Sequence, residues 1–294
     1  MSEENTRSIQ YLQENLFQTS NRYEWLSKNF HEAVNIFENC LHGAKTLSLD
    51  VFDTLLLRNH LAEAERYHLT SKRIVDHLKE QNKWLFLRNI SAESFTLLRA
   101  QAMQLTYRAR PSIAGCKEGS ILDVVANMAS TVNGDASLAS AFLQTELDFE
   151  ASQCLQLNPV LMEVMRRFQA RGGKTILISD MYLHADHIQG LFDRIDPDLK
   201  NCFSELFSSA DTIISKRSGL LYPYVENILG IDRRTVFHIG DSLHSDIEKA
   251  NAAGWNALFF PISKIEILER QNSLNKIIAH YHSKNIDISN WAKI

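Results

Sequence analysis

The sequence lacks the cysteine patterns that would assign a protein to a disulfide-rich or zinc-binding class. Its 294 residues include four cysteines, and no two of them form a CxxC pair. Cysteines spaced this widely are typical of free thiols in a reducing compartment, and they indicate neither a disulfide framework nor a zinc site. The four are Cys40, Cys116, Cys154 and Cys202.

Long apolar runs and an excess of positive charge are missing too. No run approaches the roughly 18 apolar residues of a membrane-spanning helix, and the polar start MSEENTRSIQ has no apolar core of a signal peptide. We therefore expect a cytoplasmic protein with no membrane span, although a secretion signal read by a dedicated machine would escape this argument. The net charge of −4 gives no basic surface for nucleic acid.

The remaining composition is that of an ordinary globular protein, with 45% hydrophobic and 22% charged residues. The length suits one large domain or two of ordinary size. Beyond residue 159, short apolar runs alternate with helical patterns, which predicts an α/β protein with a mostly parallel sheet and helices on both faces.

The most informative stretch is residues 46–58, TLSLDVFDTLLLR. Its apolar residues predict a buried parallel strand that ends at Asp50. A carboxylate at the carboxyl end of a strand lies where open α/β sheets bind their ligands.

Three further polar clusters follow predicted strands or turns. They contain Ser179, Lys216, and the pair Asp241 and Asp246 in GDSLHSD. Asp50 and Asp241 on neighbouring strands would form an oxygen pair suited to Mg²⁺. A strand-end serine and a lysine suit phosphate oxygens, although singly each is more often a helix cap or a surface residue.

These four clusters, in this order, resemble the haloacid dehalogenase-like (HAD) hydrolase superfamily. The strings DVFDTLLLR, ISDMYL, KRSGLLY and HIGDSLHSD are similar to a subgroup with a DxFDT first motif, predicted hydrolases of unassigned substrate. The resemblance implies a Rossmann-like parallel sheet with an inserted all-helical cap, a Mg²⁺ cofactor, and attack on phosphorus by the first aspartate.

The resemblance also implies a role for each matching residue. Asp50 would be the nucleophile and Lys216 the charge-stabilising catalytic lysine. The metal would be held by Asp50, Asp241 and the backbone carbonyl of Phe52. The remaining roles are phosphate or substrate binding by Thr54, Ser179 and Asp180, and support by Asp53 and Asp246.

One position departs from the family pattern. In DxDxT the second aspartate is the general acid/base, and here Phe52 takes its place. Phenylalanine cannot give a proton to a leaving alkoxide, and such catalysis typically contributes 10²–10⁴-fold. Asp53 falls one residue later, so we expect it to accept hydrogen bonds from backbone N–H groups of the turn instead.

Four regions follow from the patterns. They are an N-terminal helical extension (1–45), a HAD-like core (46–60 and 159–262), a helical cap without strands (61–158), and a C-terminal helical tail (263–294). In the tail we expect four apolar positions to pack on the core: Ile265, Leu268, Leu274 and Ile277. Extra helices at both ends add to the family core.

Three residues near the predicted junction of cap and core have two interpretations each. Glu146 and Glu150 lie one helical turn apart, so they either bind a polar substrate or form a solvated face. Tyr182 either lines the pocket or packs in the core.

The sequence thus predicts a Mg²⁺-dependent HAD-like hydrolase of phosphatase type, acting on a small phosphorylated molecule such as a sugar phosphate. The alternatives are a catalytically weak phosphate-binding or regulatory module, a phosphotransferase, and an interaction protein built around the terminal helices. The intact GDSLHSD disfavours a dehalogenase, which needs no Mg²⁺, and no cap lysine is singled out for a phosphonatase. No protein partner can be named from the sequence.

Overall fold

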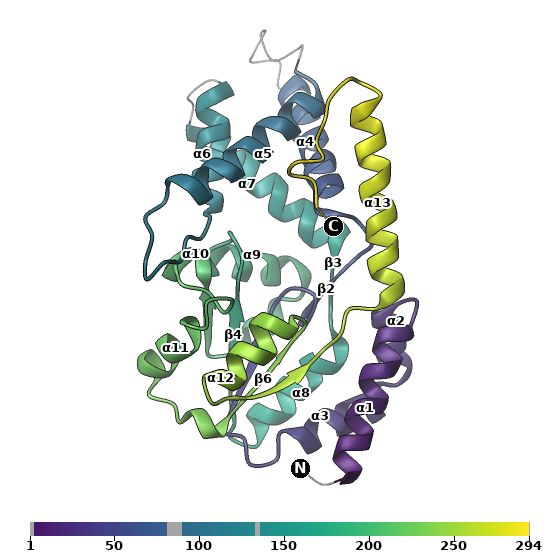
Figure 1. Cartoon of the computed structure of the whole chain (residues 1–294), viewed down its shortest axis with the longest axis vertical. Helices are drawn as coiled ribbons and strands as arrows, with labels where there is room; N and C mark the ends of the chain where they lie inside the picture. The colour runs from purple at the N-terminus through teal and green to yellow at the C-terminus, as the bar shows by residue number, and fades with distance from the viewer. Residues whose placement is uncertain (1–2, 81–89, 133–135, 294) are drawn as a thin grey trace.

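The structure is a computed structural model that describes residues 3–80, 90–132 and 136–293. A part built around a β-sheet lies beneath a helical part (Figure 1). The helices are α1 (Glu3–Gln18), α2 (Arg22–Lys28), α3 (Phe30–Cys40), α4 (Glu63–Glu80), α5 (Ala92–Ala109), α6 (Ile121–Val132), α7 (Ala136–Phe149), α8 (Pro159–Ala170), α9 (Ala185–Ile195), α10 (Ser209–Thr212), α11 (Leu221–Leu229), α12 (Lys249–Ala252) and α13 (Lys264–His282). The strands are β1 (Thr46–Asp50), β2 (Leu56–Arg58), β3 (Leu155–Leu157), β4 (Lys174–Ser179), β5 (Glu205–Ser208), β6 (Val236–Gly240) and β7 (Asn256–Phe259).

The main sheet has five parallel strands in the order β5-β4-β1-β6-β7, as the α/β prediction requires. Both faces of this sheet are covered. Along β4, Leu177 packs into one apolar cluster, while Ile176 and Ile178 pack into another. β1 is buried along its whole length, which is the environment of a central parallel strand.

The strand order places the predicted site residues together. The chain passes from β1 to β4 on one side and reaches β6 on the other, so the order reverses at β1. Ligands of open α/β sheets bind at such a switch point, at the carboxyl ends of the strands. Asp50 ends β1, Ser179 ends β4, and Asp241 follows β6 directly.

Helices α4 to α7 form a helical insertion that enters through β2 and returns through β3. These two short strands pair with each other in antiparallel fashion. The expectation of no strand in residues 61–158 is therefore wrong at β3, because three residues are too few to show an alternating pattern. Asn158 then caps α8 with its side-chain oxygen, and its amide group donates to the Thr54 carbonyl at 3.0 Å.

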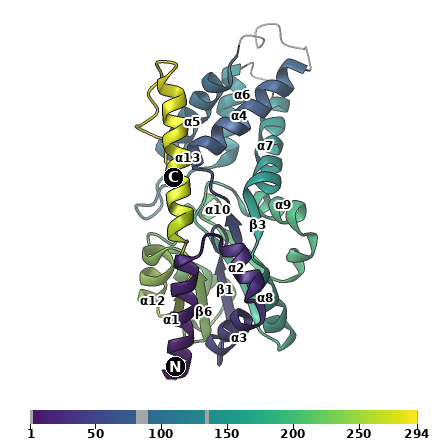
Figure 2. The same cartoon turned by 90° about the vertical axis from the view of Figure 1, so that its right-hand side faces the viewer.

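The helices at the two ends of the chain lie along one side of the molecule, purple α1 and α2 below yellow α13 (Figure 2). In α13, Leu274 and Ile277 are buried, but in a cluster with Ala62 and Ala64, where the helical insertion begins, and not on the core as expected. Ile265 and Leu268 are 37% and 54% exposed, so the expectation that they pack on the core is wrong. Among the described residues, no helix is long and apolar enough to cross a membrane.

Candidate active site

The centre of the site is a buried lysine between two carboxylates. Lys216 Nζ lies 2.5 Å from Oδ1 of Asp50 and 2.6 Å from Oδ1 of Asp246. Burial alone would lower the pKa of Lys216, but the charges of Asp246 and Asp50 raise it well above its usual range. The lysine is therefore a permanent cation fixed beside Asp50.

Asp246 has a fixed orientation because its other contacts are also buried. His238 on β6 lies between Ser48 on β1 and Asp246, with Nδ1 2.8 Å from the Ser48 hydroxyl and Nε2 3.1 Å from Asp246 Oδ1. The backbone N–H of Ser242 donates to Asp246 Oδ2. Gly240 is required here, since an added Cβ would lie 2.3 Å from Asp246 Cγ.

A third carboxylate makes the site suitable for a hard cation. Asp50, Asp241 and Asp246 each bring an oxygen within 4.8 Å of the others. Burial and then the charge of Asp50 raise the pKa of Asp241 well above its usual range. Burial also raises the pKa of Asp50 to about 6, although Lys216 opposes this. A divalent cation would remove the repulsion between Asp50 and Asp241.

The predicted site residues surround one cavity of about 400 Å³. Those lining it are Asp50, Phe52, Ser179, Asp180, Lys216, Asp241 and Asp246. Asp180 uses both carboxylate oxygens to hold the loop that carries Lys216, accepting from the backbone N–H groups of Lys216 and Arg217 at 2.7 and 2.9 Å. Thr54 is fully buried and does not itself line the cavity. Its side chain lies close to the Asp50 carboxyl and acts to lower the pKa of Asp50, against the effect of burial.

Residues 44–254 match the family model of the haloacid dehalogenase-like hydrolases. The chain belongs to this family. Its fold is similar to a 2-haloacid dehalogenase from Pseudomonas syringae pv. tomato DC3000 at 17% identity, with a TM-score of 0.51 and coverage of 74% of this chain and 86% of that one. A HAD-family enzyme from Bacteroides thetaiotaomicron, solved with magnesium and inorganic phosphate, gives 13% identity, a TM-score of 0.47, and coverage of 74% and 95%. No curated protein matches the chain.

Phe52, at the general-acid position of the HAD pattern, is almost buried, with 7% of its surface exposed. The Arg58 guanidinium lies over its ring at 4.4 Å from the centroid. Arg58 also lines the cavity, together with Glu63 and Arg66 of the helical insertion and Lys293 near the C-terminus. No motif pointed to these cavity residues, although Arg58 lies inside the DVFDTLLLR string.

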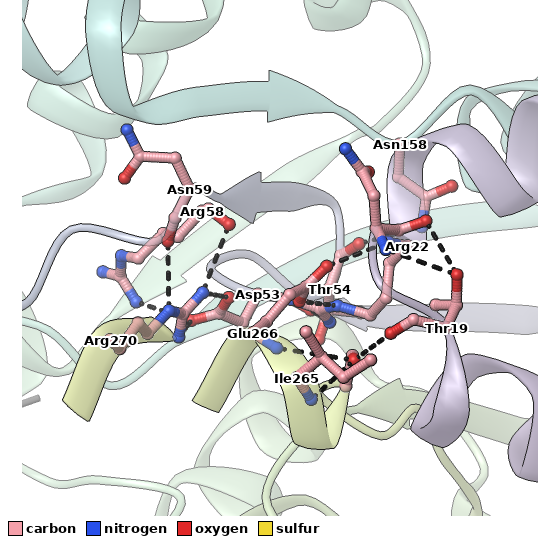
Figure 3. Close-up of polar contacts among 12 residues, drawn as sticks. Thr19, Arg22, Asp53, Thr54, Arg58, Asn59, Asn158, Ile265, Glu266 and Arg270 are labelled. Atoms are coloured by element: carbon pink, nitrogen blue, oxygen red, sulfur yellow. Dashed lines mark hydrogen bonds and ion pairs between the residues drawn. The ribbon is translucent and has the colours of Figure 1, made fainter. Parts of the chain in front are cut away.

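Asp53 does not line the cavity, and Figure 3 shows its side chain among arginines instead. Its carboxylate accepts from three guanidinium groups, those of Arg22, Arg58 and Arg270. The expectation that it bonds backbone N–H groups is therefore wrong, because arginines from outside the turn surround it. Its φ of 62° is in the left-handed region, which aspartate tolerates better than most residues. Burial would raise the pKa of Asp53, but the arginines hold it well below its usual range.

The arginines around Asp53 come from the two ends of the chain. Arg22 of α2 also bonds Glu266 of α13 at 2.6 Å, and donates to the Asp53 carbonyl at 2.7 Å. Arg270 of α13 also donates to the carbonyls of Arg58 and Asn59. The terminal helices are thus joined to the turn that follows Asp50. No local pattern predicts these contacts, since the partners are separated by up to 244 positions.

The two glutamates at the insertion's return to the core are not on a solvated face. Glu146 binds Arg99 through two bonds at 2.8 and 3.0 Å, and Glu150 binds Arg66. The Tyr182 hydroxyl donates to Glu146 at 3.1 Å, so the loop after β4 is bonded to the insertion. Tyr182 also lines the cavity, so it has both of its expected roles, lining the pocket and packing in the interior.

We expect Asp53→Asn to destabilise the protein by about 3–5 kcal/mol, because three guanidinium groups would lose their shared negative partner in a buried place. Urea denaturation measures the free energy of unfolding. The matched control is Asp232→Asn, which removes an exposed pair with Arg234 and should leave the free energy of unfolding nearly unchanged. Equal effects of the two variants would contradict the central role of Asp53.

Proposed function

We propose that the protein is a Mg²⁺-dependent hydrolase of a small phosphorylated molecule and works through an aspartyl-phosphate on Asp50. The observation that supports this most is the meeting of Asp50, Lys216 and Asp241 around one cavity. A nucleophilic carboxylate, a fixed cation and a second carboxylate for a metal are the parts that phosphoryl transfer to an aspartate requires.

Each residue of the site has a separate role in the proposed reaction. Asp50 attacks phosphorus, and the bond from phosphorus to the leaving oxygen breaks with its electron pair on that oxygen. Lys216, Ser179 and Thr54 bind the phosphoryl oxygens. Asp50, Asp241 and the carbonyl of Phe52 would hold Mg²⁺, which supplies positive charge against the repulsion between phosphate and carboxylate. Water then attacks phosphorus, releasing phosphate and restoring the Asp50 carboxylate.

Asp241 favours this function over dehalogenation. A haloacid is expected to react with the nucleophile without Mg²⁺, and a second carboxylate close to Asp50 would only repel such an anionic substrate.

The free thiols of Cys40, Cys116, Cys154 and Cys202 support a reducing, cytoplasmic setting. Phosphoryl transfer to an acceptor other than water is the second candidate, because Phe52 cannot activate water.

We expect millimolar Mg²⁺ to raise the melting temperature by about 2–4 °C, since a ligand that binds only the folded state stabilises it by mass action. Differential scanning calorimetry measures the shift. Asp241→Asn should abolish it, whereas Asp232→Asn, on the surface, should keep it. A wild-type protein with no shift would show that the metal assignment is wrong.

Beryllofluoride with Mg²⁺ should form a phosphate mimic on the Asp50 carboxylate, because that carboxylate is placed to bond a tetrahedral centre. A crystal structure of the treated protein checks this. Asp50→Asn should leave the cavity free of the adduct. An adduct on another side chain, with Asp50 free in the wild type, would exclude the nucleophilic role.

The wild type should cleave 4-nitrophenyl phosphate measurably and an alkyl phosphate poorly, because nitrophenolate leaves without a proton and an alkoxide does not. Phe52→Asp should raise kcat/KM for the alkyl phosphate roughly ten-fold or more, with a smaller gain for the aryl substrate. Steady-state kinetics on a folded variant give the comparison. Efficient alkyl-phosphate cleavage by the wild type, with no gain in Phe52→Asp, would assign the proton to another residue.

A further inference from the structure

The cluster around Asp53 carries more positive than negative charge. Three guanidinium groups face two carboxylates, those of Asp53 and Glu266. Arg22 binds both carboxylates, and Arg270 binds Asp53 twice, at 2.6 and 3.1 Å. Arg58 reaches Asp53 through one bond of 3.3 Å, so its charge is the least neutralised of the three.

Arg58 is also the one member of this cluster that lines the cavity beside Asp50. Its side chain is 18% exposed, against 0% for Arg22 and 10% for Arg270. Its Nη2 bonds the Met181 sulfur at 3.7 Å, and its Nε is buried without a hydrogen-bond partner among the described residues. A guanidinium with such weak partners retains the capacity to bind an anion.

The position of Arg58 matters because of Phe52. The guanidinium lies on the Phe52 ring, and Phe52 takes the sequence position of the general acid in the family pattern. A permanent cation therefore lies against the residue that replaces the proton donor. Guanidinium does not give up its proton in proteins, but it binds carboxylate or phosphate oxygens in a two-bond, planar arrangement.

Neither Asp53 nor Asp180 can replace the missing general acid. Both oxygens of Asp53 accept from arginines, and Asp53 does not line the cavity. Both oxygens of Asp180 accept from backbone N–H groups. Glu63 of the helical insertion lines the cavity and accepts from the Tyr67 hydroxyl at 2.7 Å, so it is the alternative that an experiment must test.

We propose that Arg58 is a catalytic residue that binds the departing group as an anion, and that the substrate is a phosphoric anhydride, either an acyl phosphate or a diphosphate. This rests on the proposed function of Asp50. The Asp50 carboxylate forms a bond to phosphorus, the anhydride P–O bond breaks, and the electron pair stays on the departing carboxylate or phosphate. That group leaves as an anion paired with Arg58, so no proton is transferred in this step.

The step that forms the aspartyl-phosphate then needs no general acid. Carboxylates and phosphates are stable anions at neutral pH, whereas an alkoxide is not. Electrostatic stabilisation of the departing charge by a fixed cation replaces protonation, and removing one such donor from an active site typically lowers the rate about 10²–10³-fold.

The test compares four substrates in the wild type, in three arginine variants and in Glu63→Gln. The substrates are acetyl phosphate, ADP, 4-nitrophenyl phosphate and glycerol phosphate. The arginine variants are Arg58→Gln, which removes the charge, Arg58→Lys, which keeps the charge without the planar group, and Arg270→Gln. Arg270→Gln is the matched control. Arg270 also binds Asp53 through its guanidinium, but it does not line the cavity.

Arg58→Gln should lower kcat/KM for at least one anhydride by about 100-fold and that for 4-nitrophenyl phosphate by less than about five-fold, because nitrophenolate spreads its charge over a ring. Arg58→Lys should recover part of the loss. Arg270→Gln should leave the ratio between the substrates unchanged, even where it lowers all rates together. If Arg58→Gln lowers kcat/KM for acetyl phosphate alone, the substrate is an acyl phosphate. If it lowers kcat/KM for ADP alone, the substrate is a diphosphate.

The beryllofluoride adduct separates this inference from the proposed function. Arg58→Gln should still form the adduct on Asp50, which shows an intact nucleophile and metal site. Equal losses on anhydrides and on 4-nitrophenyl phosphate would overturn the role of Arg58 alone. So would efficient glycerol phosphate cleavage that Glu63→Gln abolishes. Absence of both the adduct and any Asp50-dependent cleavage would overturn the proposed function and this inference with it.

Discussion

Buried negative charge at one edge of the sheet is the constraint on which the rest of this structure depends. Parallel strands bring Asp50, Asp241 and Asp246 together at a largely buried place, and Lys216 neutralises only part of their charge. The loop that carries Lys216 is fixed by Asp180, and Asp246 is fixed by His238 and by the missing side chain at Gly240. Each of these details keeps the charges at their positions.

The sheet and its site residues could be predicted from the sequence because they follow from local patterns. Polar residues at the carboxyl ends of parallel strands meet at one edge of the sheet. The apolar runs before Asp50, Ser179 and Asp241 were therefore enough to predict that the three lie close together. The position of Asp180 could be predicted, but its bonds to the Lys216 loop could not, since they depend on how two loops fold against each other.

The surroundings of Asp53 could not be predicted for a physical reason. Arg22 and Arg270 approach it from helices that precede and follow the family core, and no periodicity encodes a contact across such separations. The same holds for Glu146 and Glu150, whose spacing is equally typical of a solvated face and of a buried one. Only their pairing with Arg99 and Arg66 distinguishes the two. A short strand such as β3 could not be predicted, because three residues are too few to show an alternating pattern.

The joining of α2 and α13 behind the Asp50 turn has a consequence for the order in which a cell can make this protein. Arg22, Asp50 and Asp53 leave the ribosome early, whereas Glu266 and Arg270 follow only after the whole sheet has been synthesised. Until then Arg22 lacks one of its two carboxylates, and Asp53 lacks its two-bond guanidinium partner. The turn that follows Asp50 therefore takes its final shape late in biosynthesis, and a chain still being translated carries an incompletely supported site.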